Sequence, residues 1–336
     1  MDERVSNKIS RLQFVCSLMI IGLHTEFAEY FDVESAALLQ INGFVRNIYD
    51  AAISTFFFLA AYLLYRNAEQ KSCYYVYKRR IWSLVIPHIL WNAVYYAHKL
   101  WREYAITGMI KESLTLKIVL LKLTVQPRNY ILWFILTLLG FVVFFPVIRW
   151  AIRLKWPAWI AGVLAVVAAL MPRFPMGYTS MLYWLPVYLA GAGLGYWHHE
   201  RMERLPLCRH KWLYVLCAAA LAAMALLRPL GSAFHYLYWL PAALILWVLG
   251  DALSGAGKLA WWMKASFYLY TSHMVVQHYA VEIYLRLLGT GTVSYLLCHV
   301  LLPCVCAAVA LIGAAIVRKL MPRVFELFTG MRSYNE

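Results

Sequence analysis

Long apolar stretches recur along the whole chain and constrain its fold more than any other feature. A helix that crosses a hydrocarbon core of about 30 Å needs roughly 20 mostly apolar residues. Windows of this size predict ten spans, at residues 12–25, 48–65, 81–98, 130–149, 156–171, 182–198, 212–227, 236–250, 262–284 and 293–317. These runs lack the two-residue alternation of a barrel strand, so helices are the structure that satisfies their backbone groups in lipid. The sequence therefore predicts an all-α polytopic membrane protein.

The composition points the same way, since only 14% of the 336 residues are charged and 63% are apolar or aromatic. Soluble domains carry about 25% charged residues, so an ordinary cytosolic enzyme is excluded. The segments between the spans are short apart from residues 99–129, which leaves no room for a soluble domain of usual size. We therefore expect a single integral membrane domain over residues 1–336.

The net charge of +15 indicates how the helices are oriented. If the N-terminus is cytoplasmic, about two thirds of the 31 Lys and Arg residues fall in segments on the inner side, as the positive-inside rule requires. Both termini are therefore predicted to be cytoplasmic. Because topology explains most of the charge, the basic balance does not call for a nucleic-acid partner.

The seven cysteines do not indicate a disulfide framework or a metal site. They are odd in number, five of them lie in predicted spans, and no CxxC or Cys/His metal spacing occurs. The sequence also contains no Walker loop and no GxGxxG motif. We therefore expect no bound metal and no nucleotide-driven transport by this chain alone.

Ionisable residues inside predicted spans are costly to bury in lipid and are functional candidates by default. His24 lies near the outer end of the first span, about 20 Å of helix from Arg11. An imidazole can act as a general base near neutral pH. A histidine at this depth is equally compatible with a hydrated interfacial position.

Two further spans carry polar stripes. In the ninth span, Ser266, Tyr270, His273 and Gln277 share one helical face, which favours a polar and partly hydrated cavity. In the third span, His88, Asn92, Tyr95 and Tyr96 share a face, which suits either an aqueous cavity or hydrogen bonds between helices. Pro87 precedes that stripe and is expected to free a backbone carbonyl one turn earlier.

Three consecutive cations, Lys78, Arg79 and Arg80, lead into the third span. Such a cluster binds phosphate strongly. The same cations are expected from the positive-inside rule. Charge alone therefore leaves both interpretations open.

The order of these segments resembles the acyltransferase-3 family of integral membrane acyltransferases. The resemblance covers about residues 9–320. It is carried in chain order by the segments RLQFVCSLMIIGLH, FFFLAAYLLYRN, KRRIWSLVIPHILW, LWFILTLLGFVVFFPVI, LPVYLAGAGLGYW and SFYLYTSHMVV. The resemblance implies an O-acetyltransferase-like enzyme that takes an acyl group, commonly acetyl, from cytoplasmic acyl-CoA. The enzyme delivers this group to a hydroxyl of a cell-surface saccharide or another envelope acceptor.

The resemblance also implies roles for particular residues. His24 matches the histidine regarded as catalytic, Arg79 and Arg80 match the basic residues associated with the donor, and His273 matches the histidine of the ninth-span pattern. The family usually has a basic residue eleven positions before the first histidine, where this chain has Gln13. Arg11, two residues earlier, is therefore expected to help hold the donor, unless another cation takes this role.

The expected chemistry follows from the weakness of a hydroxyl as a nucleophile. A base must remove its proton as it attacks the thioester, and His24 is the candidate, either directly or through an acyl-histidine. The developing oxyanion needs hydrogen-bond donors set around it. Residues expected to supply these donors or to contact the acceptor are Asn92, Ser266, Tyr270 and His273.

Two other function classes compete with this interpretation. One is a proton-coupled secondary transporter with an intramembrane His/Glu relay, and the other is a non-catalytic membrane scaffold or sensor. We expect the chain in a bacterial cytoplasmic (inner) membrane, with acyl-CoA, a glycan or envelope acceptor and the lipid bilayer as partners. The sequence predicts neither the acceptor, nor the acyl chain length, nor the oligomeric state; the outer segment 99–129 is the expected place for acceptor choice.

Overall fold

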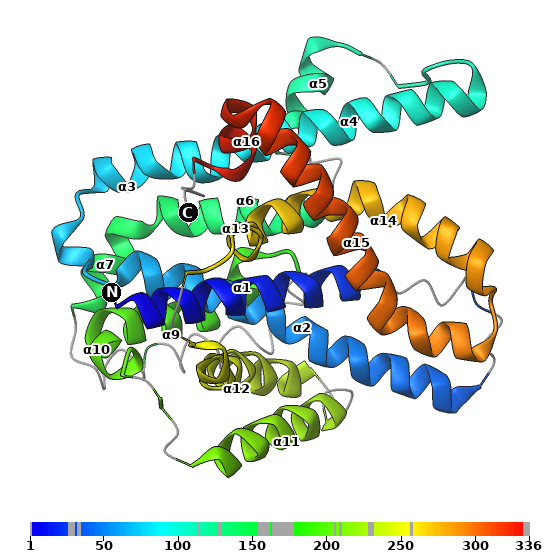
Figure 1. The fold of residues 1–336 in the computed structure, drawn as a ribbon. Helices are drawn as coiled ribbons and strands as arrows, with labels where there is room; N and C mark the ends of the chain where they lie inside the picture. Colours follow the sequence, from blue (N-terminus) through cyan, green and yellow to red (C-terminus); the bar gives the residue numbers. More distant parts are fainter. Residues whose placement is uncertain are drawn as a thin grey trace.

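The computed structural model describes residues 2–25, 31, 35–112, 114–125, 130–153, 162, 178–204, 206–207, 210–227, 232–255 and 258–331. Every regular element within these ranges is helical (Figure 1), which confirms the all-α class. The long helices are α1 (Glu3–His24), α2 (Ala36–Tyr65), α4 (Ile86–Thr107), α9 (Met181–Trp197), α11 (Lys211–Leu227), α12 (Ser232–Leu249), α14 (Ser266–Leu288) and α15 (Thr292–Leu320).

Shorter helical elements connect the long ones. They are η2 (Ala68–Gln70), α3 (Cys73–Arg80), η3 (Ile81–Val85), α5 (Leu116–Leu123), η4 (Tyr130–Leu132), α6 (Trp133–Val143), α7 (Phe145–Ile152), α10 (His199–Met202), η6 (Gly250–Leu253), α13 (Trp261–Lys264) and α16 (Pro322–Thr329). The expected outer segment 99–129 is therefore partly helical, because α4 continues to Thr107 and α5 follows it. Figure 1 shows α4 and α5 extending away from the other helices.

Fewer helices than expected meet the length and hydropathy that a membrane crossing requires. Among the described residues these are α2 and α15, with α6 and α7 as a third span if the 59° bend between them is counted as one crossing. The other apolar windows fall on helices that are shorter, such as α11, or that begin with polar turns, such as α1. The window 156–171 lies outside the described residues apart from Gly162. The structure therefore supports an apolar helical protein without establishing ten crossings.

Helix α2 lies at the centre of the packing and contacts α1, α9, α11 and α12. Its closest approach is to α9, where the backbone of Gly191 faces Phe58 and that of Gly195 faces Tyr62. A Cβ atom at either glycine would lie 2.4 Å from the facing carbonyl oxygen. Small residues at this spacing let helix backbones pack closely, so these glycines set the distance between α2 and α9.

A buried ion pair fixes the start of α1. Lys8 Nζ lies 2.5 Å from Asp251 Oδ1, and both side chains are fully buried. Lys8 also lies over the Trp247 ring, and Asp251 Oδ2 accepts a hydrogen bond of 2.6 Å from the Leu207 amide. Removing one partner of such a pair would leave an uncompensated buried charge. The pair therefore sets how α1 is rotated and seated against η6.

The chain enters α4 through a π-helical turn, η3, which follows Arg80 directly. Pro87 lies at the beginning of α4 and lacks the N–H that would bond to the carbonyl of Ser83. Gly330, which follows α16 with φ of +75°, packs against that carbonyl, where a Cβ would lie 2.6 Å from the oxygen. Trp91 Nε1 donates to the Phe328 carbonyl at 3.0 Å, so α16 and Gly330 hold η3 and α4, which directly follow Arg80.

Candidate functional site

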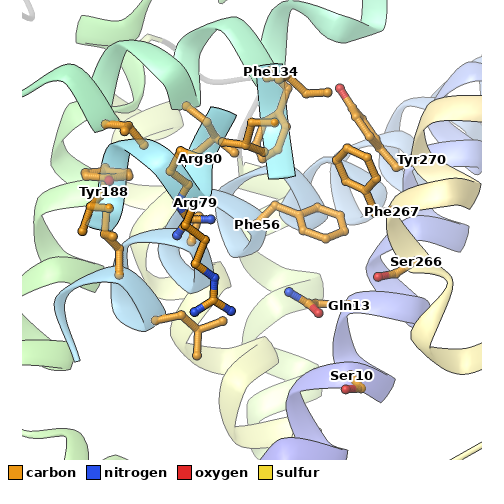
Figure 2. A pocket seen from close by; sticks show the side chains of 18 of the residues that line it. Ser10, Gln13, Phe56, Arg79, Arg80, Phe134, Tyr188, Ser266, Phe267 and Tyr270 are labelled. Atoms are coloured by element: carbon orange, nitrogen blue, oxygen red, sulfur yellow. The ribbon is translucent and has the colours of Figure 1, made fainter. Parts of the chain in front are cut away.

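A cavity of about 750 Å³ lies between α1, α2, α3, α6, α9 and α14 (Figure 2). We call it the central cavity. Its described lining includes four cations and no carboxylate: Lys71, Arg79, Arg80 and Lys264. Cavities of 300–1,000 Å³ are typical of small-molecule sites. The charge of the lining selects for an anionic ligand.

One wall of the central cavity is uncharged and polar. Ser6, Ser10 and Gln13 come from one face of α1, since they are four and three residues apart, and Ser266 comes from the first turn of α14. Figure 2 shows Ser10, Gln13 and Ser266 on the side of the cavity away from Arg80. A ligand between these walls meets Arg79 and Arg80 on one side and hydroxyl and amide groups on the other, and Lys264 lies two residues before Ser266.

The far end of the central cavity is aromatic. Phe56, Phe134, Phe267 and Tyr270 gather there (Figure 2). The rings of Phe134 and Tyr270 have centroids 5.7 Å apart, and the Tyr270 hydroxyl donates to the Ile131 carbonyl. This end suits an uncharged part of a ligand whose anionic part lies beside the cations.

Lys71 is held by the end of α2. Its Nζ donates to the carbonyls of Leu63, Leu64 and Arg66 at 3.1, 2.7 and 2.6 Å. A cation at this position satisfies carbonyls that the helix leaves free and interacts favourably with the helix dipole. Three bonds to three carbonyls need all three hydrogens of an ammonium group, so Lys71 is charged in this arrangement.

The cations of the central cavity destabilise one another's charged forms. Burial, followed by Arg80, Arg79 and Arg66, lowers the pKa of Lys71 to about 8. Burial also lowers the pKa of Arg80, and Arg79 adds to this effect. Because these cations repel one another and no carboxylate lies in the described lining, a ligand with several negative charges should stabilise their charged forms most.

His24, the last residue of α1, stacks on His273 of α14 with ring centroids 5.5 Å apart and an interplanar angle of 22°. We call these two residues the histidine pair. The Tyr130 hydroxyl of η4 lies 3.1 Å from His24 Nδ1. Tyr270 lies one helical turn from His273, with ring centroids 6.4 Å apart. The histidine pair therefore lies just beyond the aromatic end of the central cavity.

The hydrogen-bond partner of His273 fixes its protonation pattern. Nδ1 lies 3.1 Å from the Leu269 carbonyl, which can only accept, so Nδ1 carries the hydrogen. Nε2 then presents a lone pair, and it is buried with no hydrogen-bond partner among the residues that the structure describes. A neutral His273 is thus a proton acceptor at Nε2 rather than a donor to an oxyanion.

The other residues singled out in the sequence have different surroundings. Ser266 and Tyr270 line the central cavity with Arg79 and Arg80. Arg11 is not among the lining residues, and its Nη1 donates to the carbonyls of Leu253 and Gly255 at 2.6 and 3.3 Å.

Asn92 also lies outside the lining. Its Nδ2 donates to the Leu123 carbonyl at 3.3 Å, and His88 Nε2 donates to the Thr124 carbonyl at 2.7 Å. These two side chains therefore hold the end of α5.

Several residues that line the site are not predicted from the sequence to line a cavity. Gln13 and Ser10 belong to a polar stripe on α1 that the spacing of the sequence already contains. Lys71 and Lys264 look like any inner cations, since nothing in the sequence shows that they turn toward a cavity. Tyr130 directly follows the outer segment 99–129, and its contact with His24 depends on the packing of η4.

Among the described residues no group of three or more His, Cys, Asp or Glu side chains is arranged to hold a metal ion. A family model of acyltransferase 3, described as an acyltransferase domain, matches residues 7–318. This range includes the four cations of the central cavity and both members of the histidine pair. Comparison with curated proteins and with solved structures finds no match.

Proposed function

The chain belongs to the acyltransferase-3 family, and from this premise we propose that it is a membrane O-acyltransferase. In this proposal an acyl group, commonly acetyl, moves from cytoplasmic acyl-CoA to a hydroxyl of a cell-surface saccharide or another envelope acceptor. The family and the apolar helices are consistent with an integral membrane protein. We place the chain in a bacterial cytoplasmic membrane with its N-terminus inside.

The observation that carries the proposal is the polarity of the central cavity. Four cations, with Lys71, Arg79 and Arg80 at the junction of α2 and α3, suit the phosphates of coenzyme A. The aromatic end suits the apolar part of a pantetheine arm, and it leads toward the histidine pair. The thioester and the base would thus meet at the aromatic end of the central cavity, away from Arg79 and Arg80.

The chemistry assigns His24 the role of general base. It takes the proton of the acceptor hydroxyl as the hydroxyl oxygen attacks the thioester carbonyl. Collapse of the tetrahedral intermediate breaks the carbon–sulfur bond, and the protonated His24 returns a proton to the leaving thiolate. Ser266 lines the cavity two helical turns before His273 and is a candidate oxyanion donor, whereas the Tyr270 hydroxyl would have to leave the Ile131 carbonyl before it could donate to the oxyanion. An acyl-histidine route would use the same residue as nucleophile.

Purified protein, labelled acetyl-CoA and a candidate glycan provide the test. The wild type should yield acylated glycan and free thiol, and His24→Ala should abolish both. His210→Ala is the matched control, because His210 is exposed and lies outside the central cavity. Retained activity in His24→Ala would show that His24 is not the general base. Proton-coupled transport in sealed vesicles without consumption of acetyl-CoA would favour a secondary transporter instead.

A further inference from the structure

The Tyr130 hydroxyl lies between His24 of α1 and Met274 of α14. Its oxygen lies 3.1 Å from His24 Nδ1 and 3.8 Å from the sulfur of Met274. The Tyr130 ring meets the His24 ring edge-on, with centroids 5.4 Å apart. The hydroxyl therefore has one nitrogen and one thioether sulfur within hydrogen-bond reach.

Only one arrangement of hydrogens lets His24 act as a base at its other nitrogen. A neutral imidazole has one N–H donor and one acceptor nitrogen, and a phenol has one hydrogen and can accept at its oxygen. If Nε2 is to take a proton, the ring hydrogen must be on Nδ1, and Tyr130 must accept it. The phenolic hydrogen then points to Met274, whose sulfur can only accept.

The same hydrogen bond, from His24 Nδ1 to the Tyr130 oxygen, can be kept after His24 has taken a proton. Once His24 has taken a proton, both ring nitrogens carry hydrogen, so Tyr130 can only accept from Nδ1. The bond then becomes charge-assisted and stronger. A Tyr130 hydroxyl that donated to Nδ1 would have to rotate before His24 could be protonated at that bond.

We propose that Tyr130 is a positioning residue that holds His24 with its hydrogen on Nδ1, and that Met274 directs the Tyr130 hydroxyl. This inference rests on the proposed role of His24 as a base. It assigns to a phenol and a thioether the function that a carboxylate performs in the Ser-His-Asp triad, where loss of tautomer control lowers kcat by about 10⁴-fold. A neutral phenol is expected to contribute less than a carboxylate.

Kinetics of three variants test the proposal with acetyl-CoA and the acylated glycan as readout. Tyr130→Phe should lower kcat by about tenfold to a hundredfold and leave the donor KM within about twofold, since it removes an interaction of the transition state. Met274→Leu keeps the volume but removes the acceptor, so kcat should fall. Met274→Gln provides a stronger acceptor and should retain more kcat than Met274→Leu. A packing role for Met274 predicts the opposite order, because leucine conserves both volume and polarity.

Ring ¹⁵N NMR of the full-length protein in detergent reports the tautomer independently of catalysis. The His24 signals, assigned by their loss in His24→Gln, should show hydrogen on Nδ1 in the wild type and a mixture of tautomers in Tyr130→Phe. Hydrogen on Nε2 in the wild type, or an unchanged kcat in Tyr130→Phe, would overturn the proposal. The expected tautomer in a protein that transfers no acyl group would instead contradict the proposed function while leaving the hydrogen-bond arrangement intact.

Discussion

Lys71 shows how single residues tune the central cavity. Its ammonium caps α2, yet burial and three arginines lower its pKa to about 8. An anionic ligand favours the charged form, so binding should require protonated Lys71. Below pH 8 Lys71 stays largely protonated, so its titration should not change the affinity for coenzyme A. Above that pH its Kd should rise by up to about tenfold per pH unit, the limit for one linked proton.

Calorimetric titration of coenzyme A between pH 6.5 and 9.5 measures this dependence. Lys71→Arg is the matched control, because its guanidinium stays charged throughout that range. The difference between wild type and Lys71→Arg should appear only above pH 8, since ionisation of the ligand is common to both. Parallel curves for the two proteins over the whole range would show that the charge of Lys71 does not contribute to ligand binding.

At the same scale, the sequence located some site residues better than others. The run ending in Arg79 and Arg80 is a phosphate motif by composition, and both residues line the central cavity. Lys264 has no such local signal. Asn92 belongs to a visible polar stripe, but it bonds to the end of α5. Helical spacing tells which residues share a face and does not tell which neighbour that face meets.

Among the elements, α2 and α9 depend on close backbone contact. Alanine at Gly191 would place its Cβ 2.4 Å from the Phe58 carbonyl oxygen, and backbone atoms cannot move aside without displacing a helix. Gly191→Ala should therefore destabilise the protein by about 1–3 kcal/mol, the usual effect of overpacking. Thermal unfolding in detergent should show the loss as a lower midpoint.

Gly313→Ala is the control for this prediction. Gly313 lies within α15, and the nearest atom to its Cβ position is the Tyr268 hydroxyl oxygen at 3.9 Å. Alanine favours a helix over glycine by up to about 1 kcal/mol, so this variant should be neutral or slightly more stable. Equal midpoints for Gly191→Ala and Gly313→Ala would argue against close packing of α2 on α9.

Prolines lie at two observed helix starts, Pro87 in α4 and Pro146 in α7, although the sequence predicts residues 130–149 as one span. Pro87 was expected to free a carbonyl, and the turn before it is π-helical. Pro146 lies at the start of α7, where the chain bends by 59° from α6. The docking of α16 on η3 had no local signal, because it joins segments far apart in the chain and depends on Gly330 meeting Ser83.

For the whole molecule, the low content of charged residues correctly predicts apolar helices. The structure does not establish the ten membrane crossings that the hydropathy windows predict. The first window, residues 12–25, leaves out the polar turns with which α1 begins, but it does not show that they continue the same helix from Glu3. Nor do hydropathy windows distinguish a cation that orients a helix from one with a partner. Lys8 is paired with Asp251, and Arg66 with Glu203.

In the proposed function, one cavity holds the donor's phosphates at its cationic end and presents the thioester to His24 at the other. Initial rates of thiol release against acetyl-CoA concentration test it in the wild type, His24→Ala and the Arg79→Ala, Arg80→Ala double variant. Removal of the base should lower kcat by at least about 10²-fold. Removal of both guanidinium groups should raise the donor KM by at least about tenfold with kcat largely retained. Wild-type turnover in His24→Ala, or an unchanged KM in the double variant, would contradict the claim.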